Sequence, residues 1–432
     1  MKILVLADNF TPEIAATSFR THEHARVWIE RGHEVTIVTC VPNWPNGRVF
    51  PGYKNRLYQE EWIDGIRVIR VWSFIAANRG FLLRTLDFVS FMLAAIAFCW
   101  RFPKFDILVA TSPQFFTAVA GCCISVLRRR RWVFELRDIW PDSLRAVGIS
   151  QGRLIHWLEK LELFLYRRAQ RIVALTNAFK TNLTRRGIDP DKIDVVTNGV
   201  DLDRVNPARI TFDVRQRLGI DPSKFLVGYI GTTGMAHGLE TLLDAARLCQ
   251  HRNLHFVVIG TGARRQWLEA QANAMRLANV SFHDSVPHDE IPSYYAALDA
   301  ALVHLRPDPL FKTVIPSKIF ECMAMGTPIL MAVEGEAAEI VAAAGCGICI
   351  PSGDAAALAA AAERLAAEST LRAAMSTQGQ AAAQHQFNRR TKALQMLDSL
   401  HRALGIASVV RDEGPVDNLP VPESSVPVRR AA

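Results

Sequence analysis

Short apolar runs alternate with longer stretches of helical periodicity over most of the chain. In the first half, apolar runs predict strands at residues 2–7, 34–39, 66–72, 106–111, 131–136, 171–175 and 193–197. Helical patterns lie between them, near residues 17–31, 81–101, 114–127, 151–169 and 177–186. Alternation of this kind predicts a parallel sheet covered by helices.

The alternation stops at "TNGVDLDRVNP" (197–207), where Gly, Asn, Asp and Pro indicate a linker. A second series of strands then follows at 225–230, 254–260, 280–284, 300–305, 328–333 and 347–351. Helices are predicted between them near 238–250, 264–276, 288–297, 316–325, 335–344 and 353–368. The fold class is therefore α/β, with two doubly wound domains at residues 1–200 and 201–385 facing a cleft. Ligands of such sheets bind outside the carboxyl ends of the strands.

The C-terminal part of the chain departs from this alternation. We expect residues 386–406 to form a helix that packs back on the N-terminal domain. The last stretch, 407–432, is rich in Pro, Ser and Val and has no periodicity, so we expect a disordered tail.

Composition narrows the function classes. Half of the 432 residues are hydrophobic and 21% are charged, as in a globular protein with large cores. The formal net charge is +8, and basic residues are concentrated in 79–192, including the run Arg128 to Arg131. A basic face serves nucleic acid, anionic lipid or phosphorylated substrates, and a merely solvated face is the alternative. No nucleic-acid module is recognisable, so we expect no nucleic-acid partner.

The cysteines and the N-terminal sequence indicate the cellular compartment of the protein. Of the eight cysteines, only Cys346 and Cys349 have CxxC spacing, and several of the eight lie in apolar runs, as buried free thiols do. "MKILVLADNF" lacks the long apolar region of a signal peptide. Both features favour a reducing cytoplasm.

One apolar segment, "LDFVSFMLAAIAFCW" (86–100), has basic neighbours on both sides. It is shorter than the about 20 residues that a spanning helix needs. A buried core helix is one interpretation; we favour an interfacial helix on an anionic membrane. The side chains expected to enter the bilayer are Leu82, Leu83, Phe88, Phe91 and Phe98. Those expected to bind headgroups are Arg79, Arg84, Arg101 and Lys104.

Two glycine-containing loops of the second domain have phosphate-binding character. "VGYIGTTGMAHG" places Gly231, Gly234 and Gly238 before a helix, where the free N–H groups and the dipole favour an anion. "VVIGTGARRQ" places Gly260 and Gly262 before Arg264 and Arg265. Each signal alone is weak, because glycine loops before helices are common.

A third unit, "IPSKIFECMAMG", begins with Pro316, which suits the first turn of a helix. The N–H groups of Ser317 and Lys318 would then face a ligand. Glu321 lies on the same face as Lys318. A carboxylate accepts two hydroxyl groups, as in a ribose, and a lysine ammonium suits a diphosphate. The alternative is a surface ion pair between Lys318 and Glu321.

These motifs, with "TNGVD" and "DNFTPEIAATSFRTHEHARVWIERGHEVTIVT", resemble family 4 (group 1) glycosyltransferases of the GT-B fold, which has two Rossmann-like domains. The resemblance covers residues 1–405. "VPNWPNGRVFPGY", "ATSPQFF", "ELRDIWPDS" and "IPSKIFE" are similar to a bacterial branch that builds O-antigen or capsule and includes L-fucosamine transferases.

The resemblance implies retaining transfer of a sugar from a UDP-sugar, without a metal or another cofactor. It implies a polyprenyl-diphosphate-linked saccharide as acceptor, for surface polysaccharide synthesis. The enzyme would then work on the cytoplasmic face of the inner membrane as a peripheral protein. The alternatives are a nucleotide-sugar 2-epimerase of the same fold and an inactive nucleotide-sugar-binding protein.

For the donor, Glu321 matches the second glutamate of the family's paired motif, and Thr313 stands in place of the first. A threonine there suits a deoxy or acetamido sugar. His237 stands where the family carries a lysine, so we expect Lys318, with Arg264 or Arg265, to take over the charge. The glycine loops, Val286 and Ser317 complete the expected nucleotide-sugar site.

For the acceptor, the family places a histidine near the end of a central strand, where this chain has Glu135, Arg137 and Asp138. We expect Arg137 and Asp138 to contact sugar or acceptor, with Asp138 as first catalytic candidate beside Lys318 and His237. A structural ion pair between Arg137 and Asp138 is the alternative. Glu13 and Thr17 are further acceptor candidates.

Overall fold

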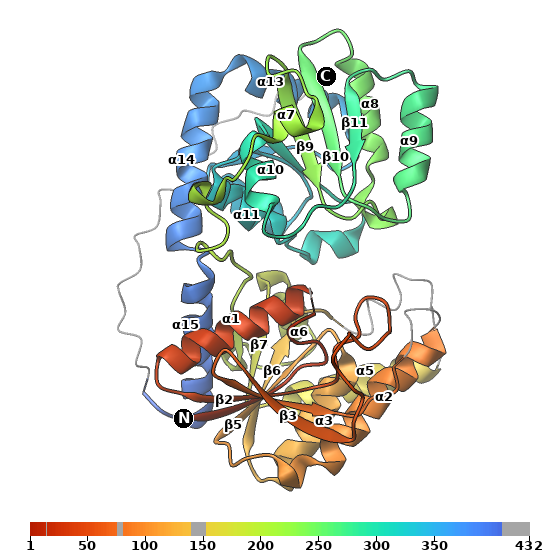
Figure 1. Ribbon diagram of the computed structural model, residues 1–432. Coiled ribbons are helices and arrows are strands. Elements are labelled where there is room, and N and C mark those ends of the chain that lie inside the picture. The colour runs from red at the N-terminus through yellow and green to blue at the C-terminus, as the bar shows by residue number, and fades with distance from the viewer. Residues whose placement is uncertain (14, 76–80, 140–152, 408–432) are drawn as a thin grey trace.

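The computed structural model describes residues 1–13, 15–75, 81–139 and 153–407. Within these ranges the chain forms two α/β domains, each built on one mainly parallel sheet (Figure 1). The predicted fold class is confirmed. The predicted tail lies outside the described residues except for its first residue.

The N-terminal sheet has eight strands in the order β3-β4-β2-β1-β5-β6-β7-β8. All neighbours pair in parallel except β3 and β4. The strands are β1 (Lys2–Leu6), β2 (Glu34–Thr39), β3 (Tyr58–Ile63), β4 (Ile66–Val71), β5 (Ile107–Thr111), β6 (Arg131–Leu136), β7 (Arg171–Ala174) and β8 (Ile193–Val195). The helices are α1 (Ala16–Glu30), α2 (Phe81–Ala97), α3 (Phe115–Leu127), α5 (Arg153–Arg168) and α6 (Asn177–Arg185).

Alternate residues of each central strand enter different cores, because side chains of a strand point to opposite faces. On β1, Leu4 and Leu6 join a core with α2, α3, α5 and α6. Ile3 and Val5 join a core with α1 and the C-terminal helix α15 (Arg389–Leu404). Burial on both faces explains why the sequence reads as continuous apolar runs.

The second sheet has six parallel strands in the order β11-β10-β9-β12-β13-β14. They are β9 (Phe225–Ile230), β10 (Leu254–Ile259), β11 (Val280–His283), β12 (Ala300–His304), β13 (Ile329–Ala332) and β14 (Gly347–Cys349). The helices are α7 (Val214–Leu218), α8 (Glu240–Leu248), α9 (Arg265–Ala274), α10 (Ile291–Ala297), α11 (Lys318–Met325), α12 (Glu336–Ala343), α13 (Ala355–Ala367) and α14 (Ser369–His385).

The chain crosses between the domains twice, and the two crossings are bonded together. The N–H of Val200 donates to the carbonyl of Phe387 at 2.8 Å, and the N–H of Arg389 donates to the carbonyl of Val200 at 2.9 Å. A Cβ on Gly199 would lie 2.3 Å from the Phe387 carbonyl oxygen, so only glycine fits there. Beyond this crossing α15 packs on α1, and the Trp28 indole donates to the carbonyl of Ala393 at 2.8 Å.

Helix α2 has one buried face and one exposed apolar face. Phe91 is fully buried in the core, which corrects the expectation that it enters a bilayer. Leu83, Leu86 and Leu93 are about half exposed, at 47%, 48% and 57%. Trp100, just beyond the helix, is 67% exposed. No helix within the described ranges is both long and apolar enough to cross a membrane.

Candidate functional site between the domains

The carboxyl edges of the two sheets face each other. The ring of Phe19, on the helix that follows β1, lies 5.1 Å from the ring of His288, which follows β11. The carboxylate of Glu336, which follows β13, accepts a hydrogen bond of 2.9 Å from the N–H of Asn177, which follows β7. Loops and helix starts that follow strands therefore meet between the domains, where ligands of parallel sheets bind.

The two glycine loops of the second domain pack against each other as one surface. A Cβ on Gly260 would lie 2.0 Å from the carbonyl oxygen of Gly231, and one on Gly262 would lie 2.8 Å from backbone atoms of Thr233. All three glycines have φ between +140° and +158°. Side chains at these positions would separate the loops, so the glycines allow the two backbones to pack directly against each other.

Lys318 lies under the first loop. Its Nζ is 4.0 Å from the centre of the Tyr229 ring, and a Cβ on Gly231 would lie 2.9 Å from Nζ. The ring face stabilises the ammonium group. Burial nonetheless lowers the pKa of Lys318 to about 8, because it disfavours the charged form. The result is a weakly solvated cation at the start of α11.

Glu321 lies one turn further along α11. The hydroxyl of Tyr295 donates to its Oε2 at 3.2 Å. Burial raises the pKa of Tyr295, and the hydrogen bond to Glu321 adds to this effect. Glu321 is half-buried, so its carboxylate remains accessible. The helix therefore presents a cation and a carboxylate on one face, and no Lys318–Glu321 ion pair is formed among the described contacts.

His237 ends the short 3₁₀ turn Met235–His237. Its carbonyl accepts from His304 Nδ1 at 2.7 Å, and its ring lies 5.9 Å from that of Tyr229. Burial, and then the charge of Lys318, lower the pKa of His237 to about 4. The imidazole is therefore neutral at physiological pH and adds no positive charge to that of Lys318.

The two arginines after the second loop differ. Arg264 stacks on the Trp267 ring at 3.7 Å, and its Nε has no hydrogen-bond partner among the described residues. Arg265 donates from Nη1 to the carbonyls of Gly260 and His283 at 2.7 and 2.6 Å. Arg265 thus links the ends of β10 and β11, while the Nε of Arg264 can still donate a hydrogen bond to a ligand.

The remaining donor-side candidates lie on loops. The Thr313 hydroxyl donates to the carbonyl of Leu310 at 2.8 Å. Ser317 is exposed at the start of α11, and Val286 is half-buried after β11. Gly234 has φ of −90°, and a Cβ there would make only ordinary contacts, so its conformation does not require glycine.

On the N-terminal side, Glu13 holds a loop together. It is 2% exposed and accepts from the N–H groups of Phe10, Asn43 and Trp44 at 2.8 to 3.1 Å. Both oxygens of its carboxylate therefore already accept hydrogen bonds from the protein backbone. Thr17 is half-buried in the first turn of α1.

The residues that end β6 lie at the same edge. Glu135 is buried and accepts from Arg20 Nε at 2.8 Å. Arg137 follows β6, and its N–H donates to the Ser112 hydroxyl at 2.7 Å. Asp138 comes next and is half-buried.

Sequence reasoning did not identify Arg20, Glu336, Tyr229 or Tyr295 as part of this region. Each acts through a partner distant in sequence: Arg20 and Glu135 are 115 residues apart, and Glu336 and Asn177 are 159 apart. A charged residue on the apolar face of α1 was the one available signal for Arg20.

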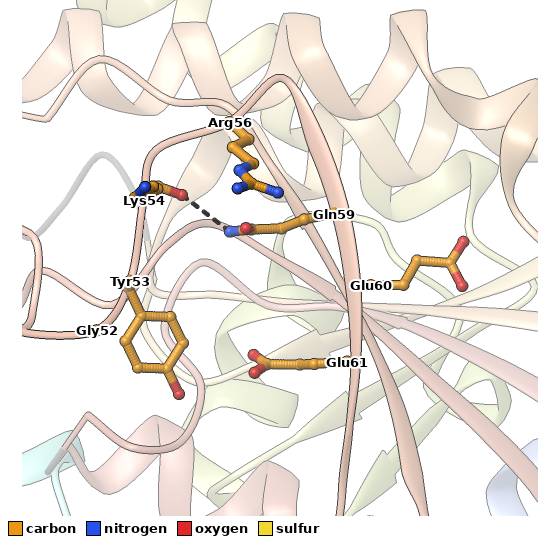
Figure 2. A pocket seen from close by; sticks show the side chains of 7 residues that line it. All are labelled: Gly52, Tyr53, Lys54, Arg56, Gln59, Glu60 and Glu61. Atoms are coloured by element: carbon orange, nitrogen blue, oxygen red, sulfur yellow. Dashed lines mark hydrogen bonds between the residues drawn. The ribbon is translucent and has the colours of Figure 1, made fainter.

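A separate pocket of about 340 Å³ lies beside the edge strand β3 (Figure 2). Within it the Gln59 side chain donates to the Lys54 carbonyl at 3.1 Å. The pocket is lined by both basic and acidic side chains. The lining residues are Gly52, Tyr53, Lys54, Arg56, Gln59, Glu60 and Glu61.

Two family models match the chain side by side. The model described as Glycosyltransferase Family 4 matches residues 18–204, and the model described as Glycosyl transferases group 1 matches residues 211–382. The chain belongs to the group 1, family 4 glycosyltransferases. The match to the second model includes both glycine loops, Lys318 and Glu321.

Relatives and solved structures agree with this glycosyltransferase assignment. The chain is 24% identical over 335 residues to the putative colanic acid biosynthesis glycosyl transferase WcaI of Escherichia coli K12, covering 76% of this chain and 82% of WcaI. The crystal structure of HepE from Anabaena in complex with UDP aligns with a TM-score of 0.68 at 20% identity, over 93% of this chain and 100% of HepE. WaaG, a glycosyltransferase involved in lipopolysaccharide biosynthesis, aligns with a TM-score of 0.62 at 17% identity, over 90% and 98%. The GT-B fold and the glycosyltransferase activity follow.

Proposed function

We propose that this glycosyltransferase moves a sugar, with retention of configuration, from a UDP-sugar to a polyprenyl-diphosphate-linked saccharide during bacterial surface polysaccharide synthesis. The observation that supports a UDP-sugar as the donor is the position of Lys318. Its ammonium group lies under the Gly231 loop, and Glu321 lies one turn away on the same helix. HepE, a protein of similar fold, is described in complex with UDP-glucose.

In this proposal Glu321 binds the ribose hydroxyls. The Tyr295 hydroxyl occupies one carboxylate oxygen and orients the group. The other oxygen accepts from a ribose hydroxyl. Lys318 and the first N–H groups of α11 bind the diphosphate, because ammonium and helix N-termini both stabilise phosphate charge.

The same groups then stabilise the leaving diphosphate during transfer. Negative charge builds on the departing oxygen, and fixed donors at that position lower the barrier most when water is excluded. Lys318 already lies in a partly dry position, on the face of Tyr229. We propose that this fixed cation serves where other enzymes use a metal. Asp138 and Arg137 are proposed to contact the sugar or acceptor from the opposite domain.

The donor sugar is proposed to be a deoxy or acetamido sugar. Thr313 stands where a second carboxylate would bind sugar hydroxyls, and its own hydroxyl is bonded to the Leu310 carbonyl. A site without that carboxylate loses hydrogen bonds to a fully hydroxylated sugar, so it discriminates less against sugars that lack hydroxyls.

The surface of the N-terminal domain supports the proposal that the acceptor is lipid-linked. The exposed leucines of α2 and Trp100 lie beside basic residues, and the Arg128 guanidinium lies 5.7 Å from the Trp100 ring. On α5, Trp157 and Phe164 are also exposed, at 61% and 50%. Apolar side chains among cations suit the interface of an anionic membrane, where a lipid-linked acceptor is held.

A donor screen tests the proposal. UDP release from a panel of UDP-sugars is measured with and without polyprenyl-diphosphate-linked saccharides. We expect acceptor-dependent release with a deoxy or acetamido donor and little with UDP-glucose. Conversion of a donor without an acceptor would instead indicate an epimerase, and no UDP binding at all would indicate that the donor site is wrong.

A further inference from the structure

The guanidinium group of Arg137 has two buried nitrogen atoms without a hydrogen-bond partner among the residues that the structure describes. Its backbone is fixed at the carboxyl edge of β6 by the bond to Ser112. Its Nε and Nη1 are buried and make no hydrogen bond with any residue that the structure describes. An arginine carries five donors, and burying them unpaired costs free energy.

The two arginines whose charges act on Arg137 are paired with carboxylates, whereas Arg137 forms no ion pair with a described residue. Arg20 bonds to Glu135 at 2.8 Å, and Arg389 forms an ion pair with Glu23. Burial lowers the pKa of Arg137 to about 10, while the charge of Glu135 raises it. Arg137 is therefore a charged group at neutral pH.

The region of Arg137 is connected to the second domain through Arg20, whose charge lowers the pKa of Arg137. Arg20, which neighbours it, donates to the side chain of Asn198 at 3.2 Å. The Asn198 amide in turn contacts the Ser317 hydroxyl, at 3.5 Å, beside the start of α11. A short chain of contacts thus connects the region of Arg137 with the position proposed for the diphosphate.

We propose that Arg137 binds an oxyanion of a substrate, a phosphoryl or carboxylate group that enters between the domains. The planar fork of a guanidinium matches both groups in a bidentate arrangement. The inference rests on the proposed function, because it assumes that the sugar and acceptor meet at this edge. The oxyanion comes either from the diphosphate of the acceptor or from a carboxylate on the transferred sugar.

Binding measurements on the Arg137→Met and Arg137→Lys variants of the full chain test this. The probes are geranyl diphosphate against geraniol for the acceptor, and UDP-glucuronate against UDP-glucose for the donor sugar. For Arg137→Met we expect the Kd of geranyl diphosphate or of UDP-glucuronate to rise about 10- to 100-fold, while the Kd of its counterpart, geraniol or UDP-glucose, stays unchanged. Arg137→Lys should recover part of the affinity.

The probe that is affected identifies the source of the oxyanion. Weakened geranyl diphosphate points to the acceptor, and weakened UDP-glucuronate points to the sugar. Wild-type affinity of Arg137→Met for both anionic probes would overturn the proposal. An equal loss for all probes, UDP-glucose included, would also overturn it, because it indicates a structural role. Absence of UDP binding by the wild-type protein would instead contradict the proposed function.

Thermal unfolding distinguishes a ligand-binding role of Arg137 from a structural role. Arg137→Met removes a buried cation that has no ion-pair partner among the described residues, so we expect its Tm to equal or exceed that of the wild type. Arg20→Met breaks a buried pair and should lower the Tm. Arg217→Met, which loses an exposed ion pair with Glu290, is the control for charge alone. A large fall in Tm for Arg137→Met would contradict the proposal.

Discussion

The ammonium nitrogen of Lys318 lies 4.0 Å from the centre of the Tyr229 ring, and the Gly231 loop runs directly above it. The two residues come from α11 and β9, elements that are adjacent in the fold and far apart in the sequence. This contact holds the cation at the edge where the donor is proposed to bind, and it limits the water around it.

Donor affinity should fall in mildly alkaline solution. The folded pKa of Lys318 is lowered to about 8, so the lysine loses its proton between pH 7 and 9. A bound diphosphate favours the protonated form, so the Kd for UDP should rise about tenfold over this range. Calorimetric titration at both pH values measures this.

The control for that titration is Lys318→Met, whose UDP affinity should lack the loss at high pH. Because the lysine pKa is lower in the folded than in the unfolded chain, this residue's contribution to stability should rise from about pH 8 to 10.5. An identical pH dependence in wild type and variant would exclude Lys318 as the titrating group.

Glu321→Gln tests the ribose contact. The variant should weaken UDP binding about tenfold, the cost of a charged hydrogen bond. It should bind a 2′,3′-dideoxyribose analogue of UDP as weakly as the wild type does, because the contact is then missing in both. An equal loss for UDP and the analogue would place Glu321 away from the ribose.

Glu336→Ala tests how the domains are held. The Glu336 carboxylate accepts from the N–H groups of Asn177 and Ala178 at the start of α6, each at 2.9 Å. Loss of these bonds should cost about 1–3 kcal/mol and favour domain separation, seen as a larger radius of gyration in X-ray scattering. Glu339→Ala, an exposed carboxylate on the same helix, should leave the radius unchanged.

Leu93→Glu tests membrane docking. Leu93 is 57% exposed, so the variant should fold normally but float less with vesicles of phosphatidylglycerol and phosphatidylcholine at low salt. Leu248→Glu, on the C-terminal domain and 55% exposed, is the matched control. Equal flotation of both variants and the wild type would exclude α2 as the docking surface.

The periodicity of the sequence predicted the sheets well where strands are buried on both faces. It missed β3, because "YQEEWI" alternates polar and apolar residues at a sheet edge and its burial is only partial. Edge strands carry a weaker apolar signal than central ones.

The candidate site was predictable only where residues are close in sequence. The spacing of Lys318 and Glu321 on one helix face could be read directly. Their contacts with Tyr229 and Tyr295, and the pairing of Arg20 with Glu135, depend on how separate elements pack, which local patterns do not determine. The lowered pKa of His237 likewise arises from burial in the folded protein.

The most direct test of the proposed role of Lys318 is the turnover of Lys318→Ala in acceptor-dependent UDP release. Removing one fixed donor to a developing charge typically costs about 100- to 1000-fold in turnover, and we expect a loss of this size. Lys312→Ala, an exposed lysine paired with Glu334, should retain wild-type turnover. Near-normal turnover of Lys318→Ala would contradict the claim that this lysine stabilises the leaving diphosphate.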